Sequence, residues 1–217
     1  MPALVCSLLP APLEGCPLWV QSVGEGLVIG LTGGIGCGKS AAAAYFAEFG
    51  YNIVDADRLA RPVLESDDCI RSLRARWGEA CLGPDGRPDR RWIAAKVFGD
   101  PAELVFLEGL THPEVARLRQ RAVIDASRHH VVEIPLLFEK NLTEGFAFIV
   151  CVACSEEVRR ARLLQKGLSE QEISQRVNSQ MTLAEKVKRS DVVLWNDGEP
   201  SFLREQVASL VGRISAH

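Results

Sequence analysis

The chain has 217 residues, of which 47% are apolar and 24% are charged, and its formal net charge is -3. This length suits one domain of ordinary size, or a core with one inserted lobe. The composition excludes a disordered chain and a coiled coil. The small net charge gives no overall field that would draw the protein onto nucleic acid or an anionic membrane, so a phosphate group would have to be held by a local site.

The start of the chain and its cysteines favour a cytoplasmic protein. The first cation is Lys39, so the positively charged start of a secretory signal is missing, and we interpret residues 1–26 as an N-terminal extension. No uninterrupted apolar stretch reaches the roughly 18 residues of a transmembrane helix. Seven cysteines, an odd number, favour free thiols in a reducing compartment. Cys151 and Cys154 form a lone C-x-x-C, which we interpret as two buried apolar cysteines rather than a metal site.

Strand and helix patterns alternate along most of the chain. A β-rich run at 27–31 leads into a glycine-rich segment, and helical spacing over 41–49 ends at Gly50, a typical position for a helix-terminating glycine. The sequence then predicts strands at 52–55, 131–134, 146–152 and 191–195, helices that begin after Ser155, Ser169 and Thr182, and a closing helix at 202–214. This alternation predicts an α/β fold with a doubly wound, mostly parallel five-stranded sheet covered on both faces.

One stretch, 58–111, has no convincing strand and predicts a helical lobe inserted after the second strand. Within it, Asp100 is expected to cap a helix, with Glu103 completing a capping box. Thr111 is expected to cap a further helix, which would place His112 in a first turn where free N–H groups could meet a phosphate. A histidine with only local hydrogen bonds is the alternative.

The glycine-rich segment carries the strongest chemical signal. Residues 33–40 read G-G-I-G-C-G-K-S and fit the phosphate-loop pattern G-x-x-x-x-G-K-[ST] between a strand and a helix. Glycines let backbone N–H groups turn toward phosphate oxygens, Lys39 reaches the β- and γ-phosphates, and the Ser40 hydroxyl binds Mg²⁺. The expected nucleotide-binding residues are Gly34, Ile35, Gly36, Cys37, Gly38, Lys39, Ser40 and Ala41. The N-K-x-D segment with which GTPases read guanine is missing from the sequence, so a small metabolite kinase is favoured.

A pair of carboxylates follows the second predicted strand, at Asp55 and Asp57. The carboxyl ends of parallel strands face the ligand crevice, so one of the two can accept the proton of an attacking hydroxyl. Solvated acids or an Asx turn are the alternative. Arg61 lies one helical turn after Asp57 and would either hold an acceptor phosphate or pair with that carboxylate.

A basic helix is predicted after the fourth strand. Arg159, Arg162 and Lys166 share one helical face, and cations there can close over the transferring phosphate and exclude water. For Arg159 and Arg160 we favour a simpler interpretation, a solvated basic surface.

Together these segments resemble the dephospho-CoA kinase family from Leu27 to the C-terminus. The resemblance rests on an ordered set of motifs: G-L-T-G-G-I-G-C-G-K-S at 30–40, D-A-D at 55–57 with Ala60-Arg61, Arg90 with Val97-Phe98, Leu107-Glu108 with His112-Pro113, P-L-L-F-E at 135–139, Arg176 with Gln180, and Asp191 with Asn196. The phosphate loop alone is unspecific, whereas the ordered set at these separations is specific.

The resemblance implies a P-loop NTPase fold and transfer of the γ-phosphate of ATP, with Mg²⁺, to the ribose 3′-hydroxyl of dephospho-CoA. It implies that Asp57 is the base and Lys39 a second catalytic residue. The implied acceptor-side residues are Thr32, Asp57, Arg61, Arg90 and His112, the implied lid residues are Arg162 and Lys166, and Ser40 is the metal ligand. The implied organisation is a nucleotide-binding core of 27–57, 112–154 and 177–217, an acceptor domain at 58–111 and a lid at 155–176. We expect a monomer or weak homo-oligomer in the cytoplasm, with small-molecule substrates and neither nucleic acid nor a membrane as partner.

Two departures from the family pattern stand out. Cys37 occupies a position where the family often has serine, and Lys166 stands where a lid arginine is expected. Two other functions remain open on the sequence alone. One is a different small-metabolite kinase resembling shikimate kinase, against which the long insert at 58–111 and the missing glycine-triplet loop argue. The other is a nucleotide-binding regulatory module without turnover.

Overall fold

A computed structural model describes residues 26–123, 125 and 127–216 of the chain, so the extension predicted at 1–26 lies outside the described residues apart from Gly26. The fold divides into two compact units. The second unit is Asp55–Ile124, and the first holds the remaining described residues on either side of it.

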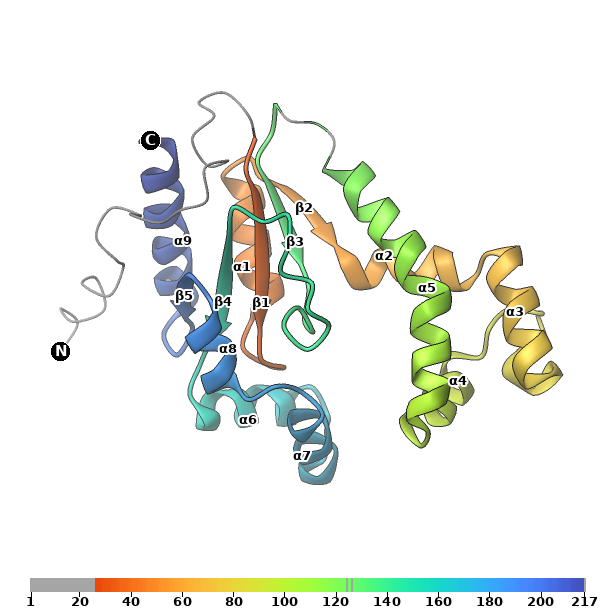
Figure 1. Cartoon of the computed structure of the whole chain (residues 1–217). Coiled ribbons are helices and arrows are strands. Elements are labelled where there is room, and N and C mark those ends of the chain that lie inside the picture. Colours follow the sequence, from red (N-terminus) through yellow and green to blue (C-terminus); the bar gives the residue numbers. More distant parts are fainter. Residues whose placement is uncertain (1–25, 124, 126, 217) are drawn as a thin grey trace. The chain divides into compact units, whose positions relative to one another are not determined.

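The first unit is built on a five-stranded sheet with the order β2-β3-β1-β4-β5 (Figure 1). Its strands are β1 (Val28–Gly33), β2 (Asn52–Asp55), β3 (His130–Glu133), β4 (Phe148–Ala153) and β5 (Val192–Trp195). β1 pairs in parallel with β3 and β4, and β4 pairs in parallel with β5. The predicted doubly wound sheet is confirmed, and each predicted strand is found to within two residues at either end.

Side-chain alternation along β1 explains why both faces of the sheet are covered. Ile29 and Leu31 are completely buried in a cluster with Phe46 of α1 (Lys39–Glu48) and Leu203 of α9 (Pro200–Ser215). Thr32 is equally buried, but its Oγ1 donates to the carbonyl of Pro135, on the segment that follows β3. A strand that is buried on both sides in this way is typical of the centre of a parallel sheet.

Three helices lie between β4 and β5: α6 (Glu156–Gln165), α7 (Glu170–Asn178) and α8 (Leu183–Arg189). The predicted caps are confirmed, since the side chains of Ser155, Ser169 and Thr182 accept from the backbone N–H three residues on. Ser169 and Glu172 form a complete capping box. These local hydrogen bonds fix where each helix begins, and therefore how the chain returns from β4 to β5.

The second unit is helical, as the sequence predicted. Its helices are α2 (Ala56–Leu64), α3 (Asp67–Trp77), the short 3-10 helix η2 (Glu79–Cys81), α4 (Arg90–Phe98) and α5 (Pro101–Ala122). This unit has its own hydrophobic core, in which Leu73 is completely buried. The core also contains Cys69, Cys81 and Ile93, with partly buried aromatic side chains packed against them. Trp77 packs against Trp92 and Phe106 in this core.

The predicted helix start at Thr111 is wrong. Helix α5 runs without a break from Pro101 to Ala122, through Pro113, so His112 lies near its middle and has no first-turn N–H groups beside it. Thr111 does not cap a helix; its hydroxyl donates to the carbonyl of Leu107, 2.9 Å away, which is the backbone bond a threonine makes inside a helix. The compact unit consequently extends to the end of α5, beyond the expected lobe boundary at residue 111.

None of the helices in the described part of the chain combines the length and the apolar character that a membrane crossing requires.

Candidate active site

The phosphate loop joins β1 to α1 in the first unit, as its motif predicted. Gly38 stands at the N-cap of α1 with a φ of 96°, and the amides of Ala41 and Ala42 donate to its carbonyl. The Lys39 ammonium arches back over the loop and donates to the carbonyls of Gly33 at 3.2 Å and Gly34 at 3.3 Å. The loop therefore combines a helix N-terminus with a lysine beside it, the arrangement that binds phosphate groups.

A carboxylate that the sequence reasoning left without a role lies beside the loop. Glu133 ends β3, the strand next to β1, and its Oε1 accepts a hydrogen bond of 3.2 Å from the Ser40 hydroxyl. Burial lowers the pKa of Lys39 below its ordinary value, and the Glu133 carboxylate acts in the opposite direction. Ser40 and Glu133 together offer two hard oxygen ligands, which is the chemistry that Mg²⁺ prefers.

Three side chains far along the chain hold the loop in place. The Gln180 amide oxygen accepts from the Ile35 N–H at 3.3 Å, and Asn196 Nδ2 donates to the Cys37 carbonyl at 2.9 Å. Arg159 lies against the loop, since a Cβ placed on Gly36 would come within 3.2 Å of its Cγ. The expectation of a solvated Arg159 is therefore wrong, because α6 turns this side of the helix toward the loop. The same expectation is confirmed for Arg160, which is exposed and pairs with Glu170.

The Cys37 thiol points away from the protein surface toward Cys154. Hydrogen bonds from Cys154, together with the charges of Lys39 and Arg159, lower the pKa of Cys37 to about 7, although burial opposes the shift. Burial raises the pKa of Cys151 to about 12. Cys151 and Cys154 are both buried at the end of β4, as expected. Among the described residues, no cluster of three or more His, Cys, Asp or Glu side chains suits a metal ion.

A cavity of about 220 Å³ opens beside Gly38 and the first turns of α1. It is lined by Tyr45, Pro200 and Leu203, with the polar side chains of Arg162 and Asn196 at its edge. The Arg162 Nη2 donates to Asn196 Oδ1 at 3.4 Å, while its buried Nη1 has no partner among the described residues. The cavity thus adjoins the phosphate loop and presents mostly apolar walls with one unused donor.

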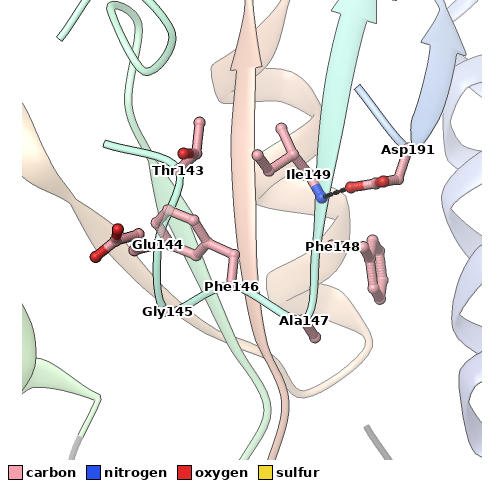
Figure 2. Close-up of a pocket in the computed structure, with 8 residues that line it drawn as sticks. All are labelled: Thr143, Glu144, Gly145, Phe146, Ala147, Phe148, Ile149 and Asp191. Atoms are coloured by element: carbon pink, nitrogen blue, oxygen red, sulfur yellow. Dashed lines mark hydrogen bonds between the residues drawn. The ribbon is translucent and has the colours of Figure 1, made fainter. Parts of the chain in front are cut away.

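A second cavity, of about 580 Å³, lies at the other end of the sheet (Figure 2). It surrounds the start of β4, where Asp191 Oδ2 accepts from the Ile149 N–H at 2.7 Å. The remaining lining residues are Thr143, Glu144, Gly145, Phe146, Ala147 and Phe148. Since the carboxylate of Asp191 is already committed to the backbone and the phosphate loop begins at the opposite end of β1, this cavity is not the candidate site.

The second unit carries the residues expected on the acceptor side. Asp55 is the N-cap of α2, where its side chain accepts from the Arg58 N–H at 3.0 Å. Asp57 lies in the first turn of the same helix and Arg61 in its last turn, and both side chains are exposed. Of the two carboxylates between which the sequence did not decide, Asp55 therefore serves as a helix cap.

Arg90 and His112 lie on helices that pack in the same unit. Arg90 begins α4 and pairs at 2.6 Å with Glu65, the C-cap of α2. His112 is exposed on α5, and α5 packs against both α2 and α4. The structure thus brings the helices that carry Asp57, Arg61, Arg90 and His112 together within one compact unit.

The two residues expected in the lid differ in their surroundings. Arg162 is half-buried in the last turn of α6 and contacts Asn196, as described above. Lys166 is exposed at the C-cap of the same helix.

The sequence reasoning gave no role to Glu133, Gln180 or Asn196, although the last two belong to the family motifs. A strand-ending acid beside a phosphate loop was the available signal for Glu133. Gln180 and Asn196 contact the loop across 145 and 159 residues, and no local pattern predicts such pairs.

The chain was compared with known proteins. The model of the dephospho-CoA kinase family matches residues 27–201. A dephospho-CoA kinase of Syntrophotalea carbinolica is 40% identical over 194 residues, which cover 87% of this chain and 92% of that protein. A crystal structure of a Thermus thermophilus protein superposes with a TM-score of 0.78 at 36% identity, covering 87% of this chain and 98% of that one. The dephospho-CoA kinase of Campylobacter jejuni shares the fold, with a TM-score of 0.58 at 24% identity over 86% of this chain and 96% of its own.

Proposed function

Because the chain belongs to the dephospho-CoA kinase family, we propose that it transfers the γ-phosphoryl group of ATP to the ribose 3′-hydroxyl of dephospho-CoA. The products are coenzyme A and ADP, and the reaction is the final step of coenzyme A synthesis. The observation that carries this proposal is the family match over residues 27–201, which spans both the phosphate loop and the helical unit with Asp57.

In this proposal the triphosphate binds at the N-terminus of α1. The backbone amides of the loop and the Lys39 ammonium donate to its oxygens, and the nucleotide base enters the cavity beside Tyr45 and Pro200. The Arg162 Nη1, which finds no partner in the described part of the chain, supplies a donor at the edge of that cavity. Arg159 and Arg162 then lie on the loop side of α6, while Lys166 completes the cationic face at the helix end.

Ser40 and Glu133 would hold Mg²⁺. Their oxygens are 3.2 Å apart, and both are ligands of the hard type that this ion selects. When bound, Mg²⁺ neutralises charge on the β- and γ-phosphate oxygens. Replacement of Glu133 by glutamine would keep a hydrogen-bonding partner for Ser40 and remove the charge, so we expect a higher Mg²⁺ requirement from that variant.

We assign the acceptor chemistry to Asp57. Its carboxylate accepts the proton of the attacking 3′-hydroxyl and orients that hydroxyl in line with the γ-phosphate. Asp55 does not take this role, because its carboxylate caps α2. Arg61, Arg90 and His112 supply donors for the phosphates and hydroxyls of the acceptor. Thr32 is assigned no contact with the acceptor, because it is completely buried and its hydroxyl donates to the Pro135 carbonyl.

The remaining expectations belong to the same proposal. The enzyme works in the cytoplasm as a monomer or weak homo-oligomer, on small-molecule substrates, with neither nucleic acid nor a membrane as partner. The near-neutral net charge of -3 supports this choice of substrates.

The proposal is tested with purified protein, Mg²⁺-ATP and dephospho-CoA, by following ADP release and the mass of the acceptor. We expect an acceptor that is one phosphoryl group heavier at the 3′ position. ATP binding without transfer to any acceptor would instead support a regulatory module, and ADP release with dephospho-CoA unchanged would mean a different acceptor.

The assigned base has a matched control two residues away. Asp57→Asn should lower kcat by about 10²–10⁴-fold and leave ATP affinity unchanged. Asp55→Asn should leave kcat within a few-fold of the wild type, because asparagine caps a helix as well as aspartate does. Equal losses in the two variants would contradict the assignment to Asp57.

A further inference from the structure

The tip of the phosphate loop is fixed by a residue from the link between α7 and α8. The N–H of Ile35 donates to the Gln180 amide oxygen at 3.3 Å. Gln180 follows the end of α7 at Asn178 and precedes Thr182, the N-cap of α8. The backbone N–H of Gln180 donates to the carbonyl of Val177, which tethers the residue to the last turn of α7.

A buried ion pair holds this link in place. Glu139 Oε1 accepts from the Met181 N–H at 2.9 Å and from the Lys186 ammonium at 2.8 Å. Lys186 is completely buried, and its ammonium also donates to the carbonyl of Pro135 at 2.7 Å. The residues immediately after Gln180 are therefore anchored on the segment that follows β3.

The charge state of the pair fits this role. Burial alone would raise the pKa of Glu139, but the hydrogen bonds from Lys186 and Met181 hold it below its ordinary value. The Lys186 side chain is completely buried and that of Glu139 is 17% exposed, so moving the ammonium away from the carboxylate would leave a buried charge unpaired. The backbone of Met181 consequently has little freedom, and neither has the neighbouring Gln180.

We propose that Gln180 is a positioning residue for phosphoryl transfer, which shapes the loop tip by holding the Ile35 amide, and that the Glu139–Lys186 pair keeps Gln180 in that position. The proposal rests on the proposed function only for the identity of the phosphoryl acceptor. Gln180 does not contact the reacting atoms in this assignment; it acts through the loop. Loss of its amide oxygen would leave the Ile35 N–H without its partner and let the loop tip adopt conformations that bind the triphosphate less well.

The first test uses Gln180→Ala with Gln175→Ala as its matched control. Gln175 is exposed on α7, five residues earlier, so its replacement removes the same side chain from the same region. ATP binding is measured by calorimetric titration without acceptor, and KM and kcat are measured with dephospho-CoA.

We expect Gln180→Ala to weaken ATP binding and to raise KM for ATP about five- to tenfold, the worth of one hydrogen bond. KM for dephospho-CoA should stay unchanged, and the thermal midpoint should fall by no more than about 2–4 °C. Gln175→Ala should match the wild type. Unchanged ATP affinity in Gln180→Ala would overturn the proposal, and so would an equal loss in both variants. Because the titration needs no acceptor, this outcome is distinct from a failure of wild-type protein to phosphorylate dephospho-CoA.

The second test addresses the ion pair by a double-mutant cycle. The variant with both Glu139→Gln and Lys186→Met removes the two charges together and so avoids an unpaired buried charge. If the pair positions Gln180, adding Gln180→Ala to this variant should weaken ATP binding less than twofold, because the contact is already lost. If the loss of ATP affinity from Gln180→Ala simply adds to the loss from the paired change, the role of the ion pair is overturned. If the paired variant does not fold, Gln180→Ala in the wild-type background still decides whether Gln180 positions the loop.

Discussion

Replacement of Gly38 by alanine should damage the protein in two separable ways. Gly38 has a φ of 96°, a left-handed conformation that costs an alanine about 1–2 kcal/mol. A Cβ at this position would also lie 2.2 Å from Asn196 Nδ2, far inside van der Waals contact. Asn196 must therefore move, and it is nearly fully buried.

The second cost follows from the hydrogen bonds of Asn196. Its Nδ2 donates to the Cys37 carbonyl at 2.9 Å, in the interior of the phosphate loop. Leaving such a buried pair unsatisfied costs about 1–3 kcal/mol. The two contributions together predict a loss of about 2–5 kcal/mol in the free energy of unfolding for Gly38→Ala, accompanied by a strong loss of ATP affinity.

Gly50 provides a control for the backbone contribution alone. Its φ is 87°, and a Cβ there would meet no heavy atom within 4 Å. Gly50→Ala should therefore cost about 1–2 kcal/mol and leave ATP affinity unchanged. Urea unfolding gives the stabilities, and calorimetric titration gives the ATP affinities.

If Gly38→Ala and Gly50→Ala lose equal stability, the contact with Asn196 contributes nothing. In an Asn196→Ala background, Gly38→Ala should cost no more than Gly50→Ala does, because the clash has been removed. Full additivity in that background would refute the account.

Three further predictions concern other parts of the molecule. ATP affinity of the wild type should fall as the pH rises through about 7, because the Cys37 thiolate that forms there repels the triphosphate. Calorimetric titrations across pH should show no such fall for Cys37→Ser, and an unchanged fall in that variant would contradict the role of the thiolate. Leu73→Ala should cost about 2–5 kcal/mol in urea unfolding, because Leu73 is completely buried, whereas the exposed Val105→Ala should change stability by less than about 0.5 kcal/mol. Ser169→Ala should cost about 1 kcal/mol in the same assay by removing the capping box of α7, and a loss below a few tenths would show that the cap is not needed.

Much of the fold could be predicted because its signals are local. The buried β1, the glycine-rich turn and the first turn of α1 are contiguous in sequence, and their order alone indicates a phosphate loop. The caps at Ser155, Ser169 and Thr182 are also local, because each side chain accepts from the backbone N–H three residues further on. The residue type at those positions is therefore enough to predict where these helices begin.

The error at Thr111 shows where local signals mislead. Thr-x-Pro-Glu is typical of a helix start, yet α5 continues through it, because packing against α2 and α4 favours one long helix. One turn before Pro113 lies Gly109, and a Cβ built on this glycine would meet no heavy atom within 4 Å apart from the backbone of its own helix. A proline inside a helix loses one backbone hydrogen bond, and the tertiary contacts of α5 outweigh that cost.

The side chains that hold the phosphate loop could not be predicted from local pattern, and the reason is geometric. The sheet order brings these side chains to the loop. It places β3, which ends at Glu133, next to β1, and the chain returns from α7 to β5 close enough to the loop for Gln180 and Asn196 to contact it. Arg159 contacts the loop because Leu163, one turn further along α6, is buried and so turns this face of the helix toward the core. The sequence alone does not separate Arg159 from Arg160, because Arg160 is also followed one turn later by a leucine, Leu164. The two arginines differ only in the structure, where Leu163 is buried and Leu164 is exposed, so the side of α6 that faces the loop is set by tertiary packing.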